Sequence, residues 1–510
     1  MSLPLPNSTP TDAGVDATGI LNLIDALERD RAQEPHGLMI LRHGAVIAQG
    51  WWAPYSADRP QLVYSLSKSF TSAAAGVLVD DGVLDLDSTV ISHFPEFADD
   101  ITDDRSRRMR VRHVASMATG HTDEMIDAAF GTDPAEPVRG LLLNPPEQEP
   151  GSVFAYNQPA TYSLAAIVQR LTGHTLVEFL RERVLGPIGA DEIAWQEWPA
   201  GRNLGYSGAF MTTDTIARLG QLLLRRGRWD QTRVLSERWV ADATSVHVAT
   251  APEAEIGTSD WSFGYGFQHW RSRHGYRGDG AFGQLCLVLP EQDMVIAYQG
   301  QTHDMQGLLD AVWRHVLPAV DRGGSASADA ALAARLAAAT LPECTVTRVA
   351  VDAARWDGAV FAEAEDEPGA GAGAGADAGE GVDAGTGADA GKGVDAGVRA
   401  VGDRPGQTAR LTRDDTGWVL TLAGATGGIT ARFMGDAGWT LTDEGGPIVA
   451  VSGGFAGDDE LLLDIAFVET PHRLHLRFER GAGVVSRRWA TAPLGKLGDL
   501  RGLSAPGAFG

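Results

Sequence analysis

Residues 64–70 of the chain are Tyr64-Ser65-Leu66-Ser67-Lys68-Ser69-Phe70, and the segment that follows, residues 70–79, is small and apolar. This pattern is typical of the start of a buried helix. Residues three apart on a helix share a face, so Ser65 and Lys68 would lie side by side. A serine with a neighbouring base becomes an activated nucleophile. The spacing therefore predicts a nucleophilic Ser65 assisted by Lys68.

The lysine itself is unusual in this chain. Of the 42 lysine and arginine residues only three are lysines, Lys68, Lys392 and Lys496, and only Lys68 follows a serine by three residues. Arginine stays protonated in proteins, whereas a desolvated lysine can lose its proton. The alternative is a surface lysine on an amphipathic helix that Ser65 caps. A helix that is apolar on all sides favours the catalytic interpretation.

The composition restricts the domain count and the classes of partner. At 510 residues the chain is long enough for two domains. A formal net charge of −25 disfavours nucleic acid and anionic membrane, because both require basic patches. Cys286 and Cys344 lie far apart and match no metal spacing. The sequence has no zinc-binding H-E-x-x-H motif, no cysteine cluster and no phosphate-binding loop, so we expect no metal and no cofactor.

The first residues have neither a basic segment nor an apolar core of a signal peptide. No apolar run is long enough to span a bilayer. These two features predict a cytoplasmic protein that does not bind membranes. The sequence indicates no particular oligomeric state.

Strand-like and helical patterns predict one antiparallel sheet built from both ends of the first domain, with helices packed around it. The strand-like runs are residues 37–41, 45–48, 285–289 and 294–298. The helical periods are residues 13–30, 161–171, 212–226 and 305–317.

The character of the chain changes after residue 322, which predicts three parts. Residues 1–322 form the first domain, residues 323–340 a connecting helix, and residues 341–510 an all-β domain with short alternating runs. Residues 366–400 are a low-complexity acidic insertion with a Gly-x-Gly-x-Asp-Ala repeat. The repeat has no bulky apolar residues to bury, so disorder is favoured over a β-helix or calcium-binding repeat.

Three segments resemble the beta-lactamase-related serine hydrolases. Residues 111–121 (VRHVASMATGH) resemble the family's "LRHLLTHTSG", residues 151–158 (GSVFAYNQ) its "PGxxFxYSN", and residues 208–218 (GAFMTTDTIAR) its "GGLxSTAxDLAR". The resemblance implies the α/β fold of serine beta-lactamases and transpeptidases, in the branch of class C beta-lactamases and D-alanyl-D-alanine carboxypeptidases. In that fold an antiparallel sheet is flanked by helices.

The resemblance also implies roles for individual residues. Ser65 would be acylated, Lys68 would activate it, and Tyr156 would be the general base or proton shuttle. Tyrosine ionises only near pH ~10, so a neighbouring ammonium would have to lower its pKa. A buried tyrosine of the core is the alternative for Tyr156. Either Asn157 or Gln158 would supply the amide of this second motif.

The motif called the third motif here, residues 278–280, departs from the family. Gly278-Asp279-Gly280 stands where penicillin-recognising members have Lys-Thr-Gly, so the cation that binds a substrate carboxylate is missing unless Arg277 or His274 replaces it. Asp279 would disfavour a carboxylate substrate. Gly280 permits a close backbone approach, so that the N–H groups of Ala281 and Ser65 would form an oxyanion hole.

Residues 264–270 and the strand that ends in Gly-x-Gly-Gln resemble the esterase and amide-hydrolase members, including nylon-oligomer hydrolases. We therefore expect a serine hydrolase that cleaves a small-molecule ester, an amide or a short peptide through an acyl-enzyme on Ser65, with Lys68 and Tyr156. One alternative is a D-amino-acid amidase or peptidase of the same fold. The other is a non-catalytic, penicillin-recognising-like binding module, which the presence of the serine, lysine and tyrosine disfavours.

Overall fold

The computed structural model describes residues 4–191, 193–344, 346, 352–364, 408–424, 427–435, 438–444, 446–494 and 503–506. The chain divides into two compact units, formed mainly by Met1–Ala339 and by the residues from Thr340 to Ser504. The predicted acidic insertion at residues 366–400 lies outside the described residues, and its disorder stays a prediction. None of the helices in the described ranges is long and apolar enough to cross a membrane.

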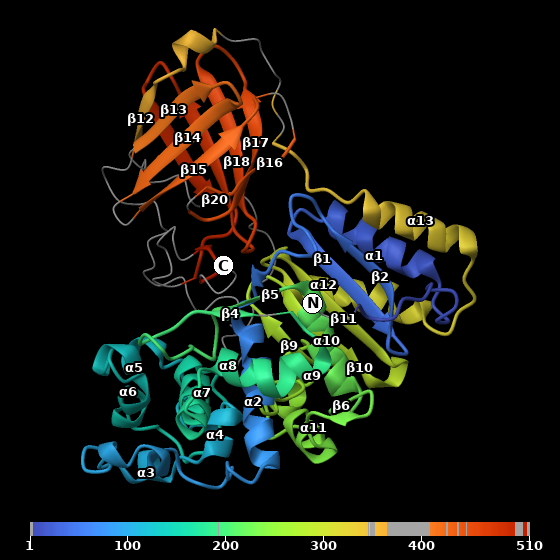
Figure 1. The fold of residues 1–510 in the computed structure, drawn as a ribbon. Coiled ribbons are helices and arrows are strands. Elements are labelled where there is room, and N and C mark those ends of the chain that lie inside the picture. Colours follow the sequence, from blue (N-terminus) through green and yellow to red (C-terminus); the bar gives the residue numbers. More distant parts are fainter. Residues whose placement is uncertain are drawn as a thin grey trace. The chain divides into compact units, whose positions relative to one another are not determined.

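The first unit is built on an antiparallel sheet with the strand order β2-β1-β11-β10-β9-β8 (Figure 1). The first hairpin pairs with the last strand, because β1 lies beside β11. The sheet is therefore assembled from both ends of the unit, as the sequence predicts. The strands are β1 (Gln33–Arg42), β2 (Ala45–Trp51), β8 (Trp270–Arg271), β9 (Tyr276–Gly280), β10 (Gln284–Leu289) and β11 (Met294–Thr302).

Helices cover both faces of this sheet. Alternating side chains of a strand point to opposite faces, and every residue of β10 is buried. Helix α1 (Ala17–Arg29) packs with α12 (Met305–His315) and α13 (Ala326–Ala337) (Figure 1), while α10 (Thr213–Leu224) packs on β1, β10 and β11. The sheet is thus the middle layer of an α/β fold, and the predicted class is confirmed.

A mainly helical region contains the second motif. Its helices are α2 (Ser67–Asp80), α3 (Asp104–Arg108), α4 (Val111–Ala115), α5 (Ile126–Thr132), α6 (Pro137–Leu143), α7 (Gln158–Thr172), α8 (Leu176–Leu180), α9 (Gly186–Ile188) and α11 (Glu237–Ala243). Short strands form two further small sheets, with the orders β3-β5-β4 and β6-β7. They are β3 (Gln61–Leu62), β4 (Ala194–Trp195), β5 (Ala209–Met211), β6 (Arg228–Trp229) and β7 (Thr232–Arg233). Helix α7 begins at Gln158, earlier than the apolar period of residues 161–171 predicts, because Pro159 suits the first turn of a helix.

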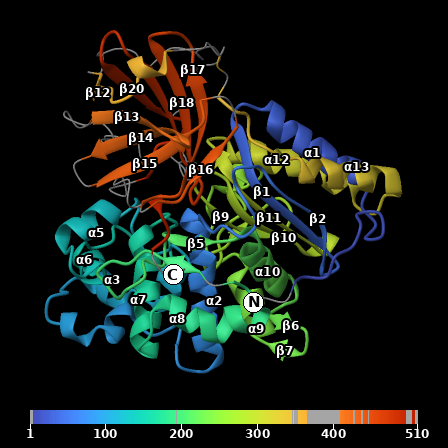
Figure 2. The same cartoon turned by 45° about the horizontal axis from the view of Figure 1, so that its top comes forward.

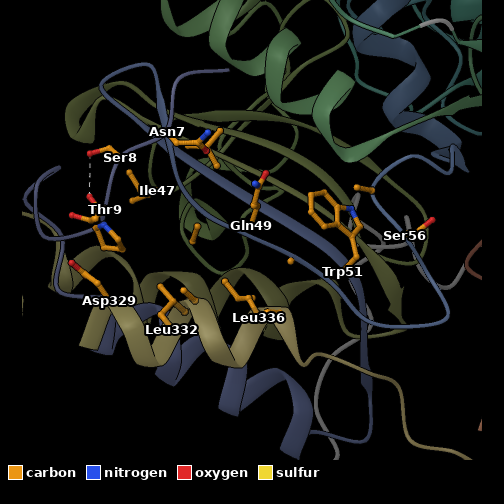
Figure 3. Close-up of a pocket in the computed structure, with 17 residues that line it drawn as sticks. Asn7, Ser8, Thr9, Ile47, Gln49, Trp51, Ser56, Asp329, Leu332 and Leu336 are labelled. Carbon is orange, nitrogen blue, oxygen red and sulfur yellow. Dashed lines mark hydrogen bonds between the residues drawn. The ribbon is translucent and has the colours of Figure 1, made fainter. Parts of the chain in front are cut away.

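A cavity of about 600 Å³ opens between the edge strand β2, the N-terminal segment and α13 (Figure 3). The side chains of Gln49 and Trp51 line it from β2, and those of Leu332 and Leu336 from α13. None of the candidate site residues predicted from the sequence lines this cavity. It is therefore separate from the site described below.

The second unit is the predicted all-β domain, confirmed as a curled sheet with the order β15-β14-β13-β12-β20-β19-β18-β17-β16 (Figure 2). Strand β15 also contacts β16 and β17, so the sheet nearly closes into a barrel around a core rich in aromatic rings. The strands are β12 (Val360–Glu363), β13 (Thr408–Asp414), β14 (Gly417–Gly424), β15 (Gly427–Phe433), β16 (Thr440–Thr442), β17 (Val449–Phe455), β18 (Glu460–Phe467), β19 (Arg473–Glu479) and β20 (Val484–Trp489).

Gly76 provides a test of the packing of α2. A Cβ atom at this position would lie 2.2 Å from Nε1 of Trp239, a buried residue of α11. We expect Gly76→Ala to lower the free energy of unfolding by about 1–3 kcal/mol, because the indole ring would have to move. Gly131 of α5 is the matched helical control, since no atom lies within 4 Å of its added Cβ. Thermal unfolding of both variants can be followed by circular dichroism. A Gly76→Ala variant that melts no lower than the wild type would contradict this packing.

Candidate active site

Ser65 and Lys68 lie together at the start of α2. A single 3₁₀ turn, Tyr64–Leu66, carries the serine and continues into α2 at Ser67, so the two residues do not share one regular α-helix as the sequence predicts. The pairing survives this difference, because the turn runs directly into the helix. Lys68 Nζ lies 3.1 Å from Ser65 Oγ, and Ser65 is partly exposed. The serine can therefore be reached by a substrate.

Lys68 is buried among oxygen atoms, with 1% of its surface exposed. Its Nζ donates to Gln158 Oε1 at 2.6 Å and to the main-chain oxygen of Tyr206 at 2.8 Å. Burial lowers the pKa of Lys68 to about 7, although the negative charges of Glu124 and Asp279 raise it part of the way back. Two carbonyl oxygens accept two N–H groups, so the third position of the nitrogen faces Ser65. A neutral Lys68 would direct its lone pair there.

Tyr156 lies against this amine in a cluster of aromatic rings. Lys68 Nζ is 4.7 Å from the centre of the Tyr156 ring, which is stacked on Trp270 at 5.5 Å. Burial, followed by the charge of Asp279, raises the pKa of Tyr156, and a hydrogen bond with Ser65 opposes the shift. The direction is opposite to the lowering that a general-base role for Tyr156 would require. Tyr156 is therefore a neutral phenol at physiological pH.

The structure separates the two candidate amides of the second motif. Gln158, the first residue of α7, accepts the hydrogen bond from Lys68. Asn157 is fully buried, and within the described ranges its side-chain amide has no hydrogen-bond partner. Gln158 is thus the amide that contacts Lys68.

Two features of the site have no counterpart in the sequence predictions. Glu124 accepts the main-chain N–H groups of Gln158 and Ile126, both at 3.0 Å. Its side chain keeps a path to solvent, yet the surrounding protein is dense enough to raise its pKa. The only signal was its place three residues beyond the family-like segment 111–121. The main-chain oxygen of Tyr206 has no signal in the sequence at all.

Strand β9 lies directly against the turn that carries Ser65. A Cβ atom at Gly280 would lie 2.0 Å from the main-chain oxygen of Val63, and one at Gly278 would lie 2.2 Å from Ser69 Oγ. Both positions therefore exclude side chains. The Cβ position of Gly280, the residue before Ala281, also lies 3.1 Å from the main-chain nitrogen of Leu66, the residue after Ser65.

Left-handed backbone conformations flank both residues of the predicted oxyanion hole. Tyr64, before Ser65, has φ 48°, and Phe282, after Ala281, has φ 66°. Such angles are uncommon for bulky residues. The two rings meet edge to face at 5.3 Å, and this contact links the two segments.

Arg277 and His274, the two candidate replacements for the missing cation, have other partners. Arg277 is fully buried, and its Nε donates to Asp279 Oδ2 at 2.9 Å. Its Nη1 donates to Ser272 Oγ and to the main-chain oxygen of Asp260. The ring of His274 packs on Trp313 of α12 at 4.9 Å. Arg277 is therefore the counter-ion of Asp279.

The two amides can be distinguished by substitution with leucine. Because Gln158 contacts Lys68, we expect Gln158→Leu to slow the reaction of Ser65 with a fluorophosphonate probe at least tenfold. Asn157→Leu should leave the melting temperature unchanged or higher, because it removes polar atoms that have no partner. It should also leave the labelling rate within about twofold. A slow Asn157→Leu variant and a fast Gln158→Leu variant would reverse the assignment.

The chain is similar to several known proteins. The family model described as Beta-lactamase matches residues 24–321. The 6-aminohexanoate-dimer hydrolase of Paenarthrobacter ureafaciens is 27% identical over 313 residues, which cover 57% of this chain and 78% of that protein. The lovastatin esterase of Penicillium rubens is 28% identical over 27% of this chain and 39% of its own length. The D-aminopeptidase of Brucella anthropi is 28% identical over 30% and 32%. The family match spans more than half of the chain, which therefore belongs to the beta-lactamase family of serine hydrolases.

Proposed function

We propose that the first unit hydrolyses small-molecule esters, amides or short peptides through an acyl-enzyme on Ser65. The observation that carries this proposal is the 3.1 Å contact between Lys68 Nζ and Ser65 Oγ. Gln158 and Tyr206 occupy the other hydrogen-bonding directions of the amine. The remaining direction of the nitrogen faces Ser65 Oγ, from which a neutral amine would accept the proton.

In the proposed acylation, Ser65 Oγ attacks the substrate carbonyl carbon while its proton passes to the neutral amine of Lys68. The carbonyl oxygen becomes negative and is held by the N–H groups of Ser65 and Ala281. Tyr156, as a neutral phenol hydrogen-bonded to Ser65, gives its proton to the leaving group and regains one from Lys68. Water then attacks the acyl carbon, and the same groups carry its proton in the reverse direction to Ser65 Oγ. The ester bond to Ser65 breaks, which releases the acid and restores the serine.

A D-amino-acid amidase or peptidase is the second candidate, and Glu124 favours it. The carboxylate of Glu124 keeps access to solvent, and its charge reaches Lys68. An ammonium group on the substrate could pair with this carboxylate at the rim of the site. The Brucella anthropi relative is named a D-aminopeptidase, although the match covers only about a third of each chain.

The function is tested by substitution of the three central residues. We expect Ser65→Ala to abolish labelling by a fluorophosphonate and all turnover. Lys68→Arg should slow acylation by about 10²–10⁴-fold, because arginine keeps its proton. Tyr156→Phe should have a comparable effect on leaving-group departure. Ser69→Ala, in the same helix, is the control that should still be labelled.

A substrate panel then separates the candidates: p-nitrophenyl esters, D-aminoacyl anilides and a chromogenic cephalosporin. Turnover confined to D-aminoacyl anilides would favour the amidase. Failure of the wild type to label at Ser65 would support the non-catalytic binding module. An unimpaired Lys68→Arg enzyme would contradict the proton-transfer role.

The pH dependence of acylation follows from Lys68. Below its pKa the amine is protonated and cannot accept the serine proton, so the labelling rate should rise with pH through a midpoint of about 7. Glu124→Gln should move this midpoint to lower pH, because the negative charge that raises the pKa of Lys68 is removed. Rates of fluorophosphonate labelling between pH 5 and 10 would measure both midpoints. A wild-type labelling rate that showed no midpoint near 7 and was still rising at pH 10, as the ordinary lysine value of ~10.4 would give, would contradict this assignment.

A further inference from the structure

We propose that Asp279 determines substrate specificity, excluding substrates that carry a negative charge on the acyl side of the scissile bond. This inference rests on the proposed function of the same site. It assigns to the third motif a role opposite to carboxylate binding, with Arg277 as the fixed partner of Asp279 rather than as a ligand of the substrate.

The position of Asp279 places it near the carbonyl group that Ser65 would attack. Asp279 precedes Ala281 by two residues, so their Cα atoms are at most about 7 Å apart. Strand β8 pairs with β9 only at Tyr276 and Arg277, so beyond Arg277 this edge of β9 has no pairing with β8. A carbonyl held by Ala281 and Ser65 would therefore have Asp279 as a near neighbour.

The charges of Arg277 and Asp279 do not cancel at Lys68 and Tyr156. The charge of Asp279 raises the pKa of Lys68 and of Tyr156. Arg277 opposes it only at Tyr156, and there more weakly than Asp279 acts. At these two groups the effect of the carboxylate therefore exceeds that of Arg277. Burial raises the pKa of Asp279 itself, whereas the charge and the hydrogen bond of Arg277 lower it. Glu124 adds a second negative charge at Lys68.

The carboxylate is also held in place. Its Oδ2 accepts a hydrogen bond from Arg277 Nε at 2.9 Å, and it is hydrogen-bonded to Trp270, the residue stacked on Tyr156. The guanidinium lies 4.4 Å from the centre of the Trp261 ring. Neither partner can turn away to accommodate an anionic substrate without breaking these contacts.

Packing prevents a cation from returning at the first position of the motif. A side chain at Gly278 would meet Ser69 Oγ at 2.2 Å and Leu66 Cδ1 at 2.7 Å. The packing of β9 against the start of α2 thus excludes a positively charged side chain at position 278, next to Asp279. Buried charges are screened little by salt, so an anionic acyl chain would be disfavoured at any ordinary ionic strength.

Three esters of equal chain length test this inference: p-nitrophenyl hexanoate, mono-p-nitrophenyl adipate and the p-nitrophenyl ester of 6-(trimethylammonio)hexanoate. We expect the wild type to have the lowest kcat/KM with the anionic ester. Asp279→Asn should raise the ratio of kcat/KM for the anionic ester to that for the neutral ester about tenfold, equivalent to about 1.4 kcal/mol. The corresponding ratio for the cationic ester should fall. Because ratios are compared, a general change in Lys68 basicity cancels.

Two further variants complete the experiment. Asp293→Asn, at the turn between β10 and β11 where the carboxylate pairs with His43, should leave all ratios unchanged. Arg277→Lys keeps the positive charge and should keep the wild-type discrimination. The inference would be overturned if Arg277→Lys lowered kcat/KM for the anionic ester alone while Asp279→Asn changed no ratio. Arg277 would then be the cation that binds the substrate carboxylate.

Fluorophosphonate labelling of Ser65 in every variant keeps the two proposals distinct. A wild type that is not labelled would overturn the proposed function, and this inference with it. Labelled proteins whose ratios do not respond to Asp279→Asn would overturn this inference alone.

Discussion

The burial of one amine organises this site. Removing an ammonium group from water is unfavourable unless hydrogen bonds replace the lost water. The fold surrounds Lys68 with a side-chain oxygen of Gln158, a main-chain oxygen of Tyr206 and the hydroxyl of Ser65. These acceptors come from three segments that are distant in the sequence. The same desolvation that requires them brings the pKa of Lys68 down to about 7.

A second constraint, the contact of β9 with the serine turn, follows from the first. In the proposed mechanism the turn presents Ser65 to a substrate while Lys68 stays buried, and β9 lies close to the turn so that Ala281 can contribute its N–H group to the oxyanion hole. Only glycine fits at positions 278 and 280 at that separation. The intervening Asp279 and the preceding Arg277 are then the residues of the strand that can set the charge of the site.

The sequence predicted what depends on local spacing and strand pattern. The pairing of Ser65 with Lys68 follows from three residues of separation, and the sheet assembled from both chain ends follows from the early and late strand-like runs. Contacts between distant segments could not be predicted. The choice of Gln158 over Asn157 depends on where α7 begins, and Glu124 depends on a loop that folds against that helix end. The direction of the Tyr156 pKa depends on burial, which motif spacing does not reveal.

The contrast between Lys68 and Tyr156 indicates which of them is the base in the proposed mechanism. The pKa of Tyr156 is raised above its ordinary value of 10.0, so forming a phenolate at pH 7 would require more than about 4 kcal/mol, at 1.36 kcal/mol for each pH unit. Lys68, with a pKa of about 7, loses its proton at that pH for almost no free energy. A negative Asp279 widens this difference at the tyrosine, because it disfavours a second anion nearby. In the proposed mechanism Lys68 therefore removes the serine proton. Tyr156 transfers a proton to the leaving group and does not exist as a free phenolate.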